Sequence, residues 1–396
     1  MKVAGIICEC NPLHAGHLHL LECARKNGAD TVVAVMSGCF VQRGEPAVAD
    51  PFIRAEILVC AGFDAVFELP FPYSASAAEH FGRAGVEILT RLGADEIWFG
   101  SECGNLPLLT RLAEIADSEE FCTRYRETAD SASGTAQAYF DQLRSMAGEE
   151  TPMISPNDIL ALSYLRAIRN CKSSIRPVTI KREGMGYNDT VLQSGFPSAT
   201  ALRLLWKRKG FEAVRNLLPP SSGDLLAKAD ENGSAPAALA NLERAILSHF
   251  RMTPPEQLEQ IAELGGGLGS RMAYFAHKAH SLDAFLSLCA TRKYTDARLR
   301  RGILFALAGI RDEDLRRPVA YARLLAANRQ GCAYLSSIRR TTTIPILTRK
   351  TDLEATSEAV QAFAIECRSR DLFTLCTPNL SSAEHLNRCT AHIADR

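Results

Sequence analysis

Apolar runs rich in β-branched residues alternate with helical patterns over the first half of the chain, and this alternation constrains the fold more than any other feature. Runs at residues 2–8, 31–38, 64–70, 95–102 and 176–182 predict strands. Helical patterns lie between and after them, at residues 17–25, 50–62, within 106–171, and from about 198 onward. Strands that are apolar throughout and alternate with helices predict a parallel sheet covered on both faces. The expected fold is therefore α/β with a doubly wound parallel sheet.

The chain has 396 residues, which is too long for one ordinary hydrophobic core. Pro, Ser and Gly interrupt all periodicity at residues 219–224. We therefore expect an α/β domain at residues 1–218 and an α-rich domain at residues 219–396. One strand-like piece is expected in the second domain, at residues 341–347.

Hydrophobic residues make up 46% and charged residues 23% of the chain, as in globular proteins, and the formal net charge is zero. No apolar run reaches the roughly 20 residues needed to span a bilayer, and the N-terminus enters a strand pattern without a cleavable signal. The expectation is a cytoplasmic protein without membrane contact. The 13 cysteines show no repeated zinc-finger spacing, so we expect neither a disulfide framework nor a bound metal.

His14 and His17 flank Gly16 directly after the first predicted strand, in the sequence HAGH. In a doubly wound sheet, ligands bind at the carboxyl ends of the strands, where this loop meets a helix N-terminus. Imidazole donors can stabilise the charge that builds on a phosphorus under attack. Zinc is the other interpretation of two close histidines, but strand alternation turns Cys8 and Cys10 to one face and Glu9 to the other. The loop is expected to bind a phosphate.

A second motif, Ser198-Ala-Thr200-Ala-Leu-Arg203, opens a helix after the last predicted strand. HxGH after the first strand together with Ser-x-Thr-x-x-Arg late in the domain resembles the nucleotidyltransferase superfamily, whose domain is Rossmann-like. Five further blocks, at residues 36–70, 99–104, 155–168, 180–189 and 292–304, resemble the tRNA(Met) cytidine acetate ligase family.

The resemblance implies an enzyme that joins acetate and ATP into acetyl adenylate with loss of pyrophosphate. The acetyl group then moves to the N4 amine of the wobble cytidine of elongator tRNA(Met), with release of AMP. His14 and His17 would be catalytic, and Mg²⁺ would accompany the triphosphate. No obligatory protein partner is implied. The implied ATP-binding residues are Ile7, Cys8, Glu9, Cys10, Asn11, Pro12, Leu13, His14, Ala15, Gly16, His17, Leu18, His19 and Leu20, with Gly100, Asn157, Arg182, Ser198, Thr200 and Arg203.

Basic residues gather in the second half, in the sequence RKYTDARLRR, with Tyr294 among them. Such a segment suits a single-stranded anticodon loop, although a solvated helix face with an Asp296–Arg300 ion pair explains it too. The expected tRNA-binding residues are Arg292, Lys293, Arg298, Arg300 and Arg301.

Two positions depart from the family pattern, namely Cys39, where Asn is usual, and Cys10, where an aromatic residue is common. A differently shaped acetate pocket is one consequence, so the preference for acetate over other small acids stays open. Two alternative functions also stay open: a small-molecule adenylyl or cytidylyl transferase on the same fold, and a non-catalytic RNA-binding protein.

Overall fold

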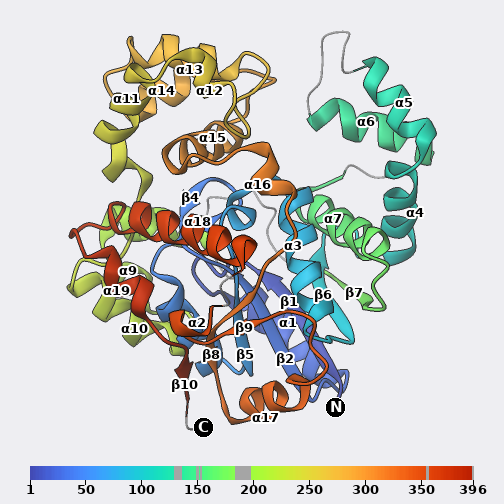
Figure 1. Cartoon of the computed structure of the whole chain (residues 1–396). Helices are drawn as coiled ribbons and strands as arrows, with labels where there is room; N and C mark the ends of the chain where they lie inside the picture. The colour runs from blue at the N-terminus through green and yellow to red at the C-terminus, as the bar shows by residue number, and fades with distance from the viewer. Residues whose placement is uncertain (129–135, 149–150, 152–153, 183–197, 354–355, 395–396) are drawn as a thin grey trace.

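A twisted sheet of mostly parallel strands forms the centre of the computed structural model (Figure 1). The structure describes residues 1–128, 136–148, 151, 154–182, 198–353 and 356–394. Residues 183–189 of the family-like block 180–189 lie outside them. Along the sheet the order is β10-β8-β5-β2-β1-β6-β7, and β9 pairs with β8. The strand bounds are β1 Val3–Cys8, β2 Thr31–Ser37, β5 Ala65–Leu69, β6 Glu96–Ser101, β7 Arg176–Lys181, β8 Ala322–Ala327, β9 Ile346–Leu347 and β10 His392–Ile393.

Strands β1, β2, β5, β6 and β7 pair in parallel, whereas β8 pairs antiparallel with β5. The predicted α/β class with a parallel sheet is therefore confirmed, with β8 as an antiparallel addition. A separate hairpin of β3 (Phe40–Val41) and β4 (Glu45–Pro46) follows the end of β2.

Alternate residues of the central strands enter two different hydrophobic clusters, one on each face of the sheet. Ile7 and Val35 pack with α3 and α7, whereas Met36 and Trp98 pack with α1, α2 and α8. Both faces are thus covered, which explains why the strands read as apolar throughout. The helices of this half are α1 Ala15–Lys26, α2 Pro51–Cys60, α3 Ala78–Arg91, α4 Leu106–Ala116, α5 Glu119–Thr128, α6 Ala136–Ala147, α7 Pro156–Asn170 and α8 Ala199–Lys209.

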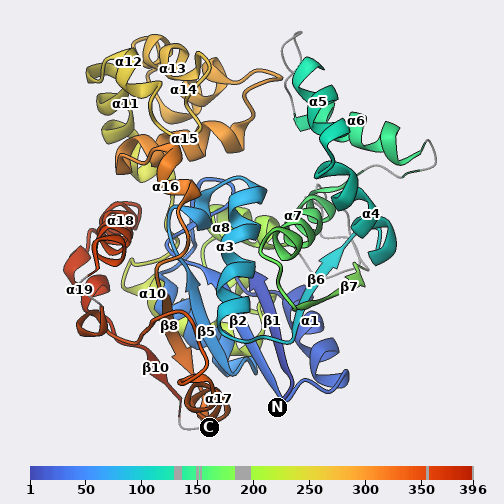
Figure 2. The same ribbon diagram turned by 45° about the vertical axis from the view of Figure 1, so that its right-hand side comes forward.

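The rest of the chain is mainly helical, and α11–α15 stand together as a lobe above the sheet (Figures 1 and 2). A third cluster joins this lobe to Phe40 and Phe71, which follow β2 and β5. The helices are α9 Glu212–Arg215, α10 Pro220–Glu231, α11 Glu243–Met252, α12 Pro255–Leu258, α13 Leu268–Ala276, α14 Leu282–Cys289, α15 Asp296–Ala308, α16 Asp312–Arg316, α17 Arg329–Ile338, α18 Ser357–Thr374 and α19 Ala383–Arg388.

The expectation of an almost wholly helical second half is wrong at β8, whose sequence ARLLAA consists of good helix formers. Every residue of β8 is buried, so pairing with β5 overrides the local preference. The strand expected at residues 341–347 shrinks to β9. The domain division at 218/219 stays a prediction. Among the described residues, no helix is both long and apolar enough to cross a membrane.

Candidate active site

The two histidines of HAGH lie side by side at the junction of β1 and α1. His14 is the N-cap of α1, and His17 lies in the first turn. The Nδ1 atom of His14 accepts a hydrogen bond from the Gly16 amide at 3.1 Å, and Nδ1 of His17 accepts one from the His14 amide at 3.3 Å. The ring centroids are 4.0 Å apart. The HxGH spacing thus builds a reciprocal capping box from two imidazoles.

These two bonds fix how the rings are protonated. Because each Nδ1 accepts a backbone proton, each neutral ring carries its own proton on Nε2. Burial, with a smaller effect of Arg182, lowers the pKa of His14 to about 4. Burial, with His14 and Arg182, lowers the pKa of His17 well below its usual value. Both imidazoles are therefore neutral donors at pH 7.

Gly100 lies in β6, and Arg182 directly follows the neighbouring strand β7. The Arg182 amide, directly after β7, donates to the carbonyl of Ser101 at 3.0 Å. A Cβ atom on Gly100 would lie 3.1 Å from Cγ of Arg182, so a larger residue there would press against the arginine side chain. Arg182 is close enough for its charge to lower the pKa of both histidines. The structure therefore places Arg182 within electrostatic reach of both histidines and Gly100 against Arg182.

Arg203 reaches the first loop from α8. Its Nη1 donates to the carbonyl of Asn11 at 2.7 Å, and its Nη2 lies 3.3 Å from a carboxylate oxygen of Glu45. Ser198 is the N-cap of α8, and its side chain accepts from the Ala201 amide. Thr200 lies in the first turn of the same helix. The second motif thus delivers a guanidinium to the loop that precedes His14.

Asn157 lies in the first turn of α7, where its amide donates to Glu102 at 2.5 Å. The other carboxylate oxygen of Glu102 accepts the Asp158 amide at 3.2 Å. Glu102 directly follows β6, so this pair ties the start of α7 to the carboxyl edge of the sheet. No contact joins Asn157 to the histidines among the described residues.

Several residues of the predicted segment 7–20 belong to the core. Ile7, Cys8, Cys10 and Leu13 are buried in the two sheet-face clusters, and Leu18 and Leu20 pack against one of them. His19 is exposed, and its ring contacts Cys23. Ala15, Gly16 and Pro12 contribute backbone to the loop and its helix.

The carboxylate of Glu9, which directly follows β1, accepts the Gln42 amide at 3.0 Å, whereas the side chains of Cys8 and Cys10 are buried in one of the sheet-face clusters. Asn11 is buried, and its side-chain oxygen accepts the Val48 amide at 2.6 Å. These bonds connect the first loop with the β3–β4 hairpin and the segment after it.

Arg54 of α2, which no sequence motif singled out, is only 2% exposed. Its guanidinium donates to the carbonyls of Glu9, Ser37, Gly38 and Ala49. It thus links the ends of β1 and β2. The sequence signal for Arg54 was a charged residue inside the apolar segment PFIRAEIL. Its partners could not be predicted, because they are backbone carbonyls, which leave no pattern in the sequence.

The five basic residues expected to bind tRNA fall into two groups. Arg292 and Lys293 are exposed, whereas the other three pair within the protein. Arg298 and Arg301 contact Glu263, and Arg300 lies between Asp296, at 2.8 Å, and Glu45, at 3.3 Å.

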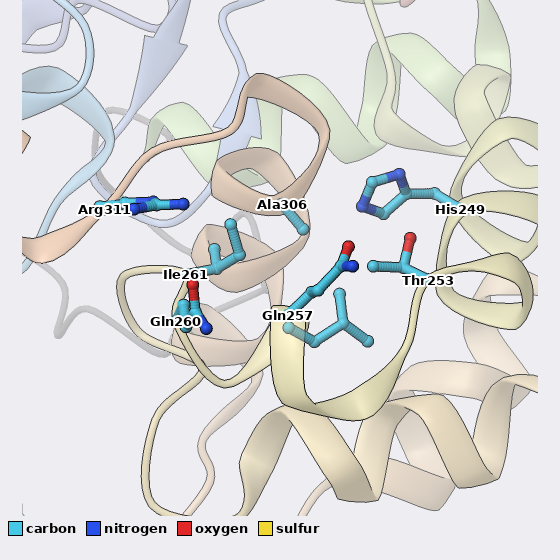
Figure 3. A pocket seen from close by; sticks show the side chains of 8 residues that line it. His249, Thr253, Gln257, Gln260, Ile261, Ala306 and Arg311 are labelled. Carbon is cyan, nitrogen blue, oxygen red and sulfur yellow. The ribbon is translucent and has the colours of Figure 1, made fainter.

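Among the described residues, no group of three or more His, Cys, Asp or Glu side chains could hold a metal ion. A cavity of about 220 Å³ lies elsewhere, in the helical lobe, lined by polar side chains such as His249 and Gln257 (Figure 3). It shares no residue with the histidine loop.

The chain is similar to known proteins over its whole length. The sequence model of the HIGH Nucleotidyl Transferase family matches residues 1–388. A tRNA(Met) cytidine acetate ligase of Caldanaerobacter subterraneus subsp. tengcongensis is 35% identical, over 96% of this chain and 97% of the relative. A protein of the same name from Acetivibrio thermocellus is 33% identical over 96% of each chain.

Two solved structures match all of this chain and are themselves matched completely. The crystal structure of Thermotoga maritima TmcAL in its apo form has a TM-score of 0.94 and 31% identity. The same protein bound with alpha-thio ATP has a TM-score of 0.91 and 30% identity.

The low pKa of His14 predicts a distinct titration. An imidazole in water titrates near 6.5, so the C2 proton signal of His14 should stay unchanged between pH 8 and about 5.5 in the ligand-free protein. Between pH 6.5 and 4 the unfolded chain binds the extra proton, so this histidine makes the fold less stable as pH falls. NMR spectra compared with those of His14→Gln identify the signal, and a midpoint near 6.5 would contradict the buried neutral ring.

Proposed function

We infer that this chain acetylates the wobble cytidine of elongator tRNA(Met) with ATP and acetate. The chain belongs to the HIGH Nucleotidyl Transferase family and, within it, to the tRNA(Met) cytidine acetate ligases. The observation that carries the proposal is the neutral histidine pair. Both Nδ1 atoms are occupied by backbone amides, which leaves each Nε2–H available to a phosphate oxygen.

In the first half-reaction an acetate oxygen attacks the α-phosphorus of ATP. The bond between the α-phosphorus and the oxygen that bridges it to the β-phosphorus breaks. Pyrophosphate leaves with the electron pair of that bond. His14 and His17 donate to the α-phosphate oxygens as charge builds there, without transferring a proton. Arg182 adds a positive charge beside them.

Arg203 holds the leaving β and γ phosphates, together with Ser198 and Thr200. Within the described part of the chain, its guanidinium donates to Asn11 and pairs with Glu45, which uses two of its five N–H groups and leaves others to bind phosphate oxygens. Gly100 and Asn157 line the nucleoside side. The described residues offer no carboxylate cage, so Mg²⁺ fits as an ion held by the triphosphate and water.

In the second half-reaction the N4 amine of cytidine attacks the acyl carbon of acetyl adenylate. The bond from that carbon to the phosphate oxygen breaks, AMP leaves, and the amine loses one proton. The wobble base reaches the site from a single-stranded loop, which proteins recognise by splayed bases. Arg292 and Lys293, basic residues of this segment that are exposed, are the tRNA contacts we favour on the helical lobe.

Transfer of label from acetate tests the function directly. With ATP and labelled acetate, the protein should label an elongator tRNA(Met) transcript, and it should not label the same transcript with uridine at the wobble position. Equal labelling of both RNAs would contradict the acceptor site. A small-molecule transferase would label neither.

Replacing His17 by Ala should slow acetyl adenylate formation roughly 100- to 1,000-fold, because one donor to the transition state is lost. Acetate-dependent release of pyrophosphate measures this step without tRNA, and reactions without acetate give the background. An unchanged rate would remove His17 from the mechanism.

Charge reversal at Arg292 and Lys293 should weaken tRNA binding and make it less dependent on salt. The slope of the logarithm of the binding constant against the logarithm of the salt concentration should fall by about one unit for each lost phosphate contact. Binding titrations at salt concentrations between about 50 and 200 mM measure this slope. Unchanged affinity at low salt would exclude this segment as a tRNA contact.

A further inference from the structure

The β3–β4 hairpin lies between the first loop and the helical lobe. Its tip is anchored by the Gln42 amide, which donates to Glu9 at 3.0 Å, and by the Gly44 amide, which donates to Val41 at 2.9 Å. Gly44 adopts a φ of +72°. This left-handed conformation suits glycine and lets the hairpin turn tightly.

The tip of the hairpin packs directly on α15. A Cβ atom at Gly44 would lie 2.4 Å from the backbone nitrogen of Arg301 and 2.6 Å from the carbonyl carbon of Arg300. Because these neighbours are backbone atoms of a helix, they cannot move aside as a flexible side chain would. The position of the hairpin tip against α15 is therefore fixed by close backbone packing.

Because of this packing, Glu45, the first residue of β4, contacts two arginines from distant parts of the chain. One carboxylate oxygen lies 3.3 Å from Nη2 of Arg203, and the other lies 3.3 Å from Nη1 of Arg300. The side chains of Arg203 and Arg300 are 21% and 23% exposed, so water screens these pairs only in part. A chain of contacts thus runs from α15 through Glu45 and Arg203 to the carbonyl of Asn11.

We propose that Glu45 positions Arg203 for the triphosphate, and that Arg300 of α15 offsets the charge of Glu45, so that the helical lobe completes the ATP site even without tRNA. This inference rests on the proposed function and assigns Glu45 and Arg300 to its first half-reaction. Glu45 is a positioning residue, because it acts through Arg203.

The charges explain why two arginines are needed. A carboxylate close to the triphosphate repels it, and Glu45 paired with Arg203 alone would cancel the charge that attracts ATP. Arg300 brings a second positive charge to Glu45, and its other carboxylate partner, Asp296, is more exposed and therefore more strongly screened by water. Arg43, at the hairpin tip, also lies within electrostatic reach of Glu45 and Arg203 and adds to the same field.

Three variants separate the charge effect from the positioning effect. Arg300→Met should raise the dissociation constant of ATP roughly three- to fivefold, the size of a partly exposed charge effect, measured without acetate or tRNA. Glu45→Gln should leave this constant unchanged or lower, but slow acetate-dependent ATP–pyrophosphate exchange roughly tenfold or more, because Arg203 loses its orientation. The double variant should bind ATP nearly as the wild type does and still exchange slowly.

Two control variants exclude a merely structural role. Asp296→Asn removes the other, more exposed carboxylate from Arg300 and should leave ATP binding and exchange within twofold of wild type. Arg300→Lys keeps the charge and should retain the wild-type affinity for ATP. Partial unfolding would lower the number of ATP sites but not the affinity of the folded ones.

The proposal is overturned if Arg300→Met binds ATP within twofold of wild type, if the double variant does not recover binding, or if Glu45→Gln exchanges at the wild-type rate. A wild-type protein with no acetate-dependent exchange would instead refute the proposed function.

Discussion

The buried guanidinium of Arg54 is the interaction on which the site most depends. It is 2% exposed and binds the backbone carbonyls of Glu9, Ser37, Gly38 and Ala49. A buried charge is costly unless hydrogen bonds compensate it, and the four carbonyl partners provide that compensation. Because these carbonyls belong to the ends of two adjacent strands and the approach to α2, one side chain fixes the loops that carry the histidines and the hairpin.

A second buried network holds the C-terminal segment against the same edge of the sheet. Arg370 of α18 lies 2.9 Å from Glu68 of β5 and 3.4 Å from Glu366. Burial raises the pKa of Glu68, but the charges of Arg370 and Arg323 and hydrogen bonds with Arg370 and Glu366 together outweigh it, so the net pKa is lowered. Burial, with the charge of Glu68, raises the pKa of Glu366 well above its usual value. The trio thus holds one carboxylate, one carboxylic acid and one guanidinium. Glu366 also accepts the Phe71 amide at 3.0 Å, just beyond β5.

Local pattern was sufficient for much of the fold and for part of the site. The strands of the first half are apolar because both faces are covered, and the HxGH and Ser-x-Thr-x-x-Arg motifs contain the groups that cap helices beside the sheet. The strand β8 was not predictable, because its Ala and Leu residues become a strand only by pairing with β5. Arg54 and Glu45 act through partners up to 45 and 255 positions away in the sequence, so periodicity gives no sign of them.

In the proposed mechanism, two neutral imidazoles present Nε2–H donors to the α-phosphate while Arg203 holds the leaving phosphates. A crystal structure of this chain with a non-hydrolysable ATP analogue tests it most directly. Nε2 of His14 and Nε2 of His17 should each lie within about 3.2 Å of an α-phosphate oxygen, with Nδ1 still bound to the backbone amides. Rings turned so that Nδ1 faces the nucleotide, or a triphosphate bound away from Arg203, would contradict it.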